Sequence, residues 1–181
     1  MCRTANCLPG CDCPDAKKFT KHLADFRSGD EITISADGAW AVHAVDLDGD
    51  GDVDALSGST TSNTVAWHEN DGDENFTTHT ITTSATYAGW VDAADLDGDG
   101  DVDVLSAAYF GDKIAWYEND GSESFTPHTI TTSTDGPHSV HAADMDGDGD
   151  VDALSASFND DKIAWYENDG SENFTERVIS S

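Results

Sequence analysis

An all-β fold of repeated four-stranded antiparallel sheets is predicted by two features of the sequence. An acidic stretch that begins at Asp46 recurs at Asp95 and at Asp144, which gives a repeat period of 49 residues. Each period also contains four short candidate strands, and no segment has a convincing helical periodicity. Four antiparallel strands in a unit of about 40–50 residues are typical of a β-propeller blade. We therefore expect three complete blades and part of a fourth.

The chain begins with a Cys-rich segment, residues 1–18, which contains Cys2, Cys7, Cys11 and Cys13. In a secreted chain these residues would form two disulfides, and we favour that interpretation. A zinc site is the alternative, although a Cys-x-Cys spacing without a nearby His fits the usual zinc motifs poorly. An unstructured end, or a remnant of a neighbouring domain, is the third interpretation.

Residues 19–36 resemble the end of a repeat, because residues 19–22 match residues 76–79 further along the chain. Complete repeats follow over residues 37–85, 86–134 and 135–181. The candidate strands of the last repeat are residues 140–143, 153–156, 162–167 and 174–179. Asn168-Asp169-Gly170 separates the third candidate strand from the fourth and is a hairpin signal.

The acidic stretch of the first repeat, Asp46–Asp54, carries five carboxylates in nine residues, with almost no Lys or Arg nearby. Charges this close repel one another strongly, so we expect a cation between them in the folded chain. Oxygen ligands at alternate positions favour a hard ion, and flexible coordination by many oxygens favours calcium over magnesium. A solvated acidic turn without a metal is the alternative, but three copies of a self-repelling cluster need a reason. The sequence thus predicts about three calcium ions.

Each loop should hold its ion through side-chain oxygens of the first, third, fifth and ninth residues and the backbone carbonyl of the seventh. Glycines at the fourth and sixth positions allow the backbone to turn tightly around the ion. An EF-hand is excluded, because Ser57 stands where that loop needs a Glu and because short candidate strands, 42–45 and 55–57, flank the loop. The candidate metal ligands are Asp46, Asp48, Asp50, Asp52, Asp54, Asp95, Asp97, Asp99, Asp101, Asp103, Asp144, Asp146, Asp148, Asp150 and Asp152.

The composition is strongly acidic, with 37 acidic and 8 basic residues and a formal net charge of −29. This charge argues against partners such as nucleic acids and anionic membranes, and it is also compatible with adaptation to high salt. No apolar run is long enough to span a membrane, and the first residues lack the apolar stretch of a signal peptide. We expect either that export information is missing or that the chain is a piece of a longer protein.

Two motifs together resemble a known family. The run Asp-Leu-Asp-Gly-Asp-Gly-Asp-Val-Asp-Val-Leu-Ser at 95–106 and the run Lys-Ile-Ala-Trp-Tyr-Glu-Asn-Asp-Gly at 113–121 look like the FG-GAP/VCBS repeat. That repeat builds the calcium-bearing propellers of integrin α-subunits and of many secreted bacterial and algal proteins. The resemblance covers residues 37–181 and implies calcium at the acidic positions of each loop. The chain departs from the family in having only three complete repeats, and the first repeat lacks the Lys and Tyr at residues 64–68.

Alternation along a strand predicts that both faces of a blade are covered by apolar side chains. Ile114 and Trp116 should lie on one face, with Ala115 and Tyr117 on the other. Blades that stack face to face bury both surfaces, so these aromatic residues are expected to be core residues. His79 and His128 share a repeat position and are expected to be structural.

The loops should divide between two ends of the blades. The calcium loops and the Asn-Asp-Gly turns share one end, whereas the loops between second and third strands and the connections between blades share the other. The second end varies from repeat to repeat and carries Trp40, Tyr87, Trp90 and His138. Variable loops on a rigid scaffold favour ligand binding, here of a carbohydrate or a protein. The alternative is that these aromatic residues only cap the blade ends.

We expect a non-enzymatic extracellular or cell-surface module for adhesion or for binding a protein or carbohydrate, as part of a larger propeller. The alternative is the propeller portion of a secreted polysaccharide-degrading enzyme such as a lyase, for which His138 is the one candidate catalytic residue; a mere spacer is a third option. The Cys-rich segment and the sequons at Asn75 and Asn173 agree with export. Three blades alone would leave two faces uncovered, so we expect further blades or a homo-oligomer.

Overall fold

The computed structural model describes Ile32 and residues 36–181, which belong to one compact unit extending from Ile32 to Ser181. The expected Cys-rich segment, residues 1–18, lies outside the described residues. The same is true of the expected partial repeat, residues 19–36, apart from Ile32 and Ala36.

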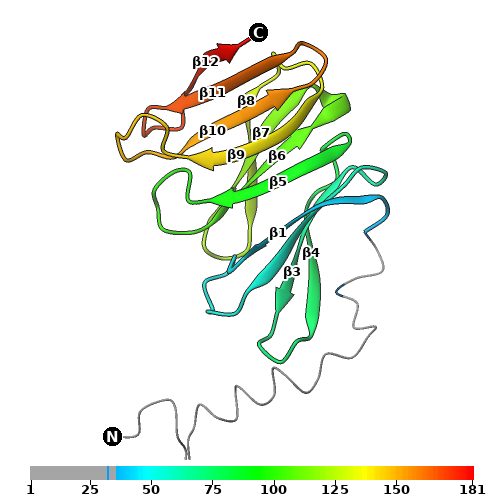
Figure 1. Ribbon diagram of the computed structural model, residues 1–181. Coiled ribbons are helices and arrows are strands. Elements are labelled where there is room, and N and C mark those ends of the chain that lie inside the picture. Colours follow the sequence, from blue (N-terminus) through cyan, green and yellow to red (C-terminus); the bar gives the residue numbers. More distant parts are fainter. Residues whose placement is uncertain (1–31, 33–35) are drawn as a thin grey trace, which may run out of the picture. The chain divides into compact units, whose positions relative to one another are not determined.

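The described residues form twelve strands in three sheets (Figure 1), each built from four consecutive strands in antiparallel order. The first sheet contains β1 (Ala39–Val45), β2 (Asp54–Ser59), β3 (Thr64–Asn70) and β4 (Phe76–Thr82). The second contains β5 (Ala88–Ala94), β6 (Asp103–Ala108), β7 (Lys113–Asn119) and β8 (Phe125–Thr131), with the 3-10 turn η1 (Tyr109–Gly111) before β7. The third contains β9 (Pro137–Ala143), β10 (Asp152–Ser157), β11 (Lys162–Asn168) and β12 (Phe174–Ser180).

The predicted fold class is confirmed: the protein is all-β, and its three four-stranded antiparallel sheets are consistent with propeller blades. The connection between third and fourth strands lies where the candidate strands left it, around Asn168-Asp169-Gly170. In the third sheet it has five residues, from Asp169 to Asn173, and is closed by a hydrogen bond of 3.3 Å from the Asp169 N–H to the Asn173 carbonyl. Both Gly170 and Glu172 adopt left-handed backbone conformations within it, with φ of 71° and 61°.

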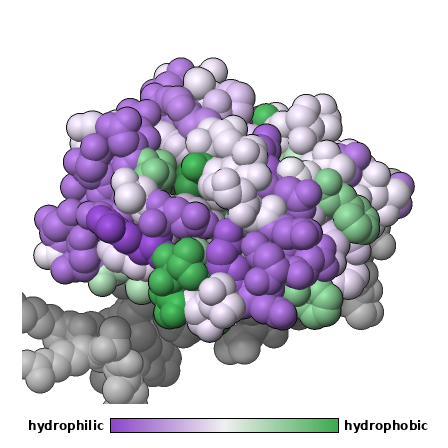
Figure 2. All heavy atoms as spheres, turned by 90° about the horizontal axis from the view of Figure 1, so that it is seen from above, coloured by the Kyte–Doolittle hydropathy of each residue, from purple (hydrophilic) through white to green (hydrophobic). Residues whose placement is uncertain are grey.

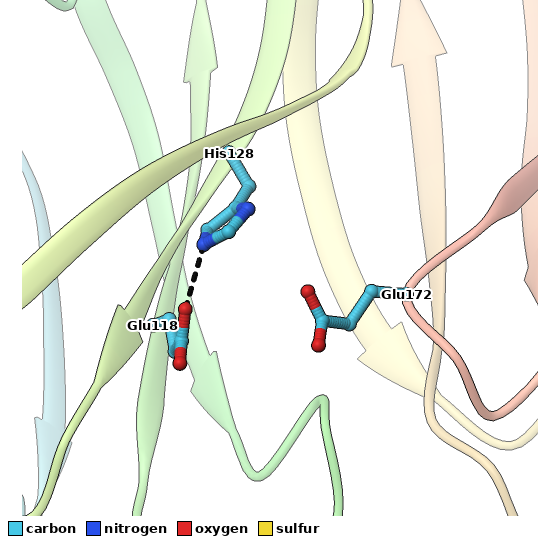
Figure 3. Close-up of side chains that lie close together, drawn as sticks. All are labelled: Glu118, His128 and Glu172. Carbon is cyan, nitrogen blue, oxygen red and sulfur yellow. Dashed lines mark hydrogen bonds and ion pairs between the residues drawn. The ribbon is translucent and has the colours of Figure 1, made fainter.

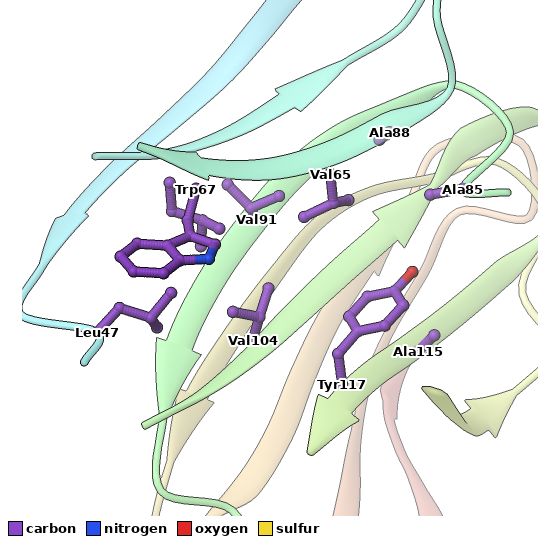
Figure 4. Packing of buried hydrophobic residues seen from close by; sticks show 10 residues of the cluster. Leu47, Val65, Trp67, Ala85, Ala88, Val91, Val104, Ala115 and Tyr117 are labelled. Atoms are coloured by element: carbon purple, nitrogen blue, oxygen red, sulfur yellow. The ribbon is translucent and has the colours of Figure 1, made fainter. Parts of the chain in front are cut away.

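The second sheet is covered by apolar residues on both faces, as the alternation of its third strand predicts. Ala115 and Tyr117 of β7 belong to a buried cluster with Trp67 and Val65 of the first sheet (Figure 4). Ile114 and Trp116 belong to a second buried cluster, which contains Ala164 and Tyr166 of the third sheet. Each interface between neighbouring sheets therefore has its own hydrophobic core.

The sheets approach one another most closely through their first strands. β5 lies beside β1 on one side and beside β9 on the other, as Figure 1 shows. The fourth strand is the opposite edge of each sheet, so the sheets fan out from the row of first strands. This arrangement places the three acidic loops, which join the first strand of each sheet to the second, along one end of the stack. The described residues form no helix with the length and hydrophobicity that crossing a membrane requires.

Candidate metal centres

Each acidic loop joins the first strand of its sheet to the second and folds around its own first Asp. In the first loop the carboxylate of Asp46 accepts hydrogen bonds from the backbone N–H groups of Gly49 and Gly51, at 2.9 and 3.0 Å. Asp95 and Asp144 accept the corresponding bonds in the other loops, at 2.7 to 3.2 Å. The same local folding thus occurs three times.

The two glycines of each loop are required by the backbone conformation. Gly49 and Gly51 have φ of 76° and 96°, and the equivalent glycines of the other loops have φ between 79° and 104°. A residue with a Cβ is strained in this left-handed region. A Cβ would meet no neighbouring atom at Gly49 or Gly51, so the requirement comes from the backbone and not from crowding.

The carboxylates of the alternating positions gather into a cluster in every loop. Oxygens of the first, third and fifth Asp lie within 4.8 Å of one another in the first two loops, and those of the first, third and ninth do so in the last. The grouped residues are Asp46, Asp48 and Asp50, then Asp95, Asp97 and Asp99, and finally Asp144, Asp146 and Asp152. Three carboxylates at this separation fit a hard divalent cation, so each cluster can hold a metal ion.

The ninth Asp of each loop is buried and clamps the loop to the rest of its sheet. The Asp103 carboxylate accepts hydrogen bonds from the backbone N–H groups of Leu96 and Asn119, both at 2.8 Å. Burial raises the pKa of the Asp103 carboxyl to about 7, although these two hydrogen bonds lower it and the nearby loop carboxylates raise it. Asp54 and Asp152 make the equivalent pairs of bonds. The ninth carboxylate is therefore both a candidate ligand and a structural anchor.

The seventh Asp of each loop packs its carboxylate against the turn between the third and fourth strands of its sheet. A Cβ built on Gly72 would clash with the Asp52 carboxylate, and the same relation joins Gly121 to Asp101 and Gly170 to Asp150. The glycine of each Asn-Asp-Gly turn is therefore favoured by its left-handed φ of 70° to 74° and by the loop carboxylate that packs against it. For the seventh residue this leaves the backbone carbonyl as the atom available to an ion in the loop.

The loops of neighbouring sheets are connected through an Asn side chain. Asn119, the last residue of β7, donates from Nδ2 to the Leu47 carbonyl of the first loop at 3.3 Å. Asn168 donates in the same way to the Leu96 carbonyl of the second loop at 2.9 Å. Since Leu47 and Leu96 each follow the first Asp of a loop, every interface between sheets fixes the backbone of one candidate metal centre.

The variable end of the blades carries a continuous row of rings. Tyr87 lies 6.4 Å from Trp40 and 4.7 Å from Phe110, measured between ring centroids. Tyr109 contacts Phe110 at 5.0 Å and His138 edge-on at 6.2 Å. Rings from all three repeats therefore meet at the end opposite the acidic loops, and Trp40, Tyr87 and His138 were expected there from the sequence.

A polar row on the first strands was not anticipated from the sequence. His43, Asp92 and His141 occupy the same repeat position, and Nδ1 atoms of both imidazoles contact the buried Asp92 carboxylate, at 3.3 and 2.6 Å. The Ala142 N–H also donates to Asp92, at 2.9 Å. Their common spacing of 49 residues is visible in the sequence as one repeat position. The row ties the three sheets together along their inner edge.

His79 and His128 have matching surroundings at their shared repeat position. His79 stacks on Trp67 at 4.5 Å, and His128 stacks on Trp116 at the same centroid distance. Their Nε2 atoms lie 2.8 and 2.7 Å from Glu69 and Glu118.

A known family model matches the chain twice, at segments that follow both the repeat period and the acidic loops. The family model described as an FG-GAP-like repeat matches residues 46–106 and again residues 95–155. Each matched segment begins at the first Asp of one acidic loop and ends after the next loop. No curated protein matches the chain. The two matched segments together cover more than half of the 181 residues, and the chain therefore belongs to the FG-GAP-like repeat family.

Proposed function

We propose that this chain is a calcium-stabilised binding module of an extracellular or cell-surface protein. The observation that carries the proposal is the difference between the two ends of the blades. One end repeats the same carboxylate-lined loop three times, which suits a structural ion in each blade. The other end differs from repeat to repeat and exposes large rings, with Trp40 60% and Phe110 68% exposed.

The aromatic end has the chemistry of a surface that binds a carbohydrate or a protein. Exposed rings provide rigid apolar area that a sugar face or an apolar side chain can cover. Polar groups stand beside the rings: the Tyr109 hydroxyl donates to the Asn159 side chain at 3.2 Å, and Asn159 donates to Asp135 at 2.9 Å. We propose a binding role without catalysis, with the propeller portion of a polysaccharide lyase as the alternative.

Export is supported by the calcium loops and by the position of the sequons. Calcium modules of modest affinity are filled in the extracellular medium, where the ion is abundant. Asn75 and Asn173 lie in exposed turns between third and fourth strands, where a glycan would not disturb the core.

We further propose that another blade of the same kind covers the outer face of the third sheet. Ile163 is 43% exposed there, whereas Ile114 at the same position of the second sheet is fully buried by the third. Met145 is 42% exposed, and its counterpart Leu96 is 2% exposed. Figure 2, which views the molecule from the side where β9–β12 lie in Figure 1, shows hydrophobic patches within a largely hydrophilic surface. Exposed apolar faces of this kind mark interaction sites.

A glycan array probed with the calcium-loaded protein tests the binding proposal. A binding module is supported if the protein binds a glycan on the array, if Trp40→Ala or Phe110→Ala weakens that binding, and if no product is released on prolonged incubation. Release of shortened saccharides would favour the enzyme. An array on which both variants bind like the wild type would place the ligand elsewhere on the molecule and overturn the role of the aromatic end.

A further inference from the structure

A second kind of ligand set lies between the second and third sheets, and none of its three residues belongs to an acidic loop (Figure 3). Glu118 comes from β7, His128 from β8, and Glu172 from the turn between β11 and β12. One ligand atom from each side chain lies within 4.8 Å of the other two. This set combines an imidazole with two carboxylates, so it differs in chemistry from the all-carboxylate loops.

The β7–β8 hairpin positions the first two ligands. Trp116 pairs with His128 across the hairpin, and the imidazole stacks on the indole at 4.5 Å with an interplanar angle of 20°. His128 Nε2 lies 2.7 Å from Glu118 Oε2. The ring is thus held by packing, with Nε2 already directed at a carboxylate oxygen and about one third of each side chain exposed.

The third ligand arrives from the neighbouring sheet on a fixed turn. The side chain of Asn168 anchors this turn to the Leu96 carbonyl of the second sheet at 2.9 Å. Glu172 follows with a left-handed backbone, φ 61°, and its carboxylate faces Glu118 and His128 in Figure 3. Its position is therefore set by the same interface that carries the other two residues.

Two carboxylates that face each other across an interface repel, and the chain already has a net charge of −29. A cation between them removes this repulsion. The imidazole decides which cation, because nitrogen ligands favour zinc and similar transition metals, whereas calcium takes oxygen ligands. We propose that Glu118, His128 and Glu172 bind a divalent transition-metal ion of the zinc class, which connects the second sheet to the third.

Tetrahedral coordination of zinc would require only small movements of these three side chains. Ligand atoms around a tetrahedral zinc ion are about 3.3 Å apart, as follows from bonds of about 2.0–2.1 Å. The His128–Glu118 separation of 2.7 Å must open slightly, and the separations from Glu172 must close from at most 4.8 Å. Nε2 would bind the metal while Nδ1 keeps the proton of the neutral ring. Three protein ligands leave the fourth position to water.

The third sheet shows what replaces the ion where the imidazole is missing. Arg177 occupies the position of His128 and pairs with Glu167, the counterpart of Glu118, at 2.6 Å. That copy already has a fixed positive charge. The residues that correspond to Glu118, His128 and Glu172 in the previous repeat are Glu69, His79 and Glu123. Glu123 lines a pocket with Leu47 and Gly49. Among the described residues, these three side chains do not come together as a candidate ligand set.

The test is a zinc titration of the full chain with saturating calcium present and with the Cys thiols alkylated, so that neither the acidic loops nor Cys residues contribute. His128→Gln and Glu172→Gln each remove one ligand. Glu74→Gln is the matched control, because Glu74 has the same turn position and a left-handed φ of 68° but belongs to the first sheet. Cobalt(II) absorption then reports whether the coordination is tetrahedral.

We expect one saturable zinc site in the wild type and in Glu74→Gln, with affinity lowered more than about tenfold in both ligand variants. Zinc should raise the melting temperature of the wild type and not that of Glu172→Gln. A wild type without saturable zinc binding under these conditions would overturn the proposal. So would Glu172→Gln or His128→Gln protein that binds zinc as tightly as the wild type.

Discussion

The side-chain amide of Asn168 donates a buried hydrogen bond of 2.9 Å to the backbone carbonyl of Leu96, 72 residues earlier in the chain. Leu96 is the second residue of an acidic loop, and Asn168 is the last residue of β11 in the next sheet. The same amide donates to the Val151 carbonyl of its own loop at 3.2 Å. One side chain therefore fixes the backbones of two neighbouring candidate metal centres.

Replacing Asn168 by Ala should lower both stability and calcium affinity. The Leu96 carbonyl would be left buried without its partner, which costs about 1–3 kcal/mol. Asn70→Ala is the matched control, because Asn70 donates to the Val53 carbonyl of its own loop and is the equivalent last residue of β3 in the first sheet. Thermal melts with and without calcium compare the two. Equal losses in both variants would show that the bond between sheets has no special importance.

Asp99→Ala should remove one calcium site and leave the others. Asp99 is the fifth residue of the second loop, and its carboxylate belongs to that cluster alone. Calcium counted by equilibrium dialysis should fall from three ions to two. Simultaneous loss of all three sites would mean that the blades are coupled far more tightly than nearest-neighbour stacking implies.

His68→Tyr should make stability less sensitive to acid. His68 stands where Tyr117 and Tyr166 stand in the other sheets, and it is bonded to Ser57 at 3.0 Å and Thr78 at 2.9 Å. Burial lowers the pKa of His68 below its ordinary value of 6.5, and the nearby His79 lowers it further. The unfolded chain then binds a proton that the folded chain resists, so the wild type loses stability as the pH falls through about 6.5.

The predicted loss of stability at low pH is tested by melting temperatures of the wild type and His68→Tyr, measured with saturating calcium from pH 8 to pH 5.5. The tyrosine does not titrate in this range, and its hydroxyl has Ser57 as a partner, as Tyr117 has Ser106 at 3.3 Å. The advantage of the variant should grow as the pH falls. A constant difference between the two proteins would contradict the assignment of His68 as a buried neutral base.

Ile163→Glu should reduce self-association of the chain. A charge at this position interrupts the apolar face that the third sheet exposes, without touching the cores between the sheets. Sedimentation with calcium should give the wild type a mass above 19.2 kDa and the variant a mass near that value. A wild type that is already monodisperse at 19.2 kDa, with a sharp cooperative melt, would show that three blades suffice.

Much of the fold follows from local sequence. The 49-residue period, the alternation around Trp116 and the glycines of the loops each restrict a short stretch of chain, so the strands could be placed to within a few residues. The backbone conformation inside the turn could not be predicted, because nothing local shows that Glu172 adopts a left-handed conformation.

The sites between sheets depend on which surfaces meet. Glu118 and Glu172 are far apart in sequence, and only the stacking of the second sheet against the third brings them together. The row formed by His43, Asp92 and His141 was visible as one repeat position, but its meaning requires that the first strands lie side by side. Long-range pairs of this kind cannot be derived from a repeat period alone.

The most direct test of the account is calcium binding coupled to folding. Modules of this kind have dissociation constants of about 10⁻⁴–10⁻³ M, and at ten times such a constant each site stabilises by about 1.4 kcal/mol. Three sites would supply about 4 kcal/mol, a large part of the ~5–15 kcal/mol of a typical domain. We predict three bound calcium ions per chain and a sharply lower melting temperature after chelation. A chain that binds no calcium and melts at the same temperature in chelator would contradict the account.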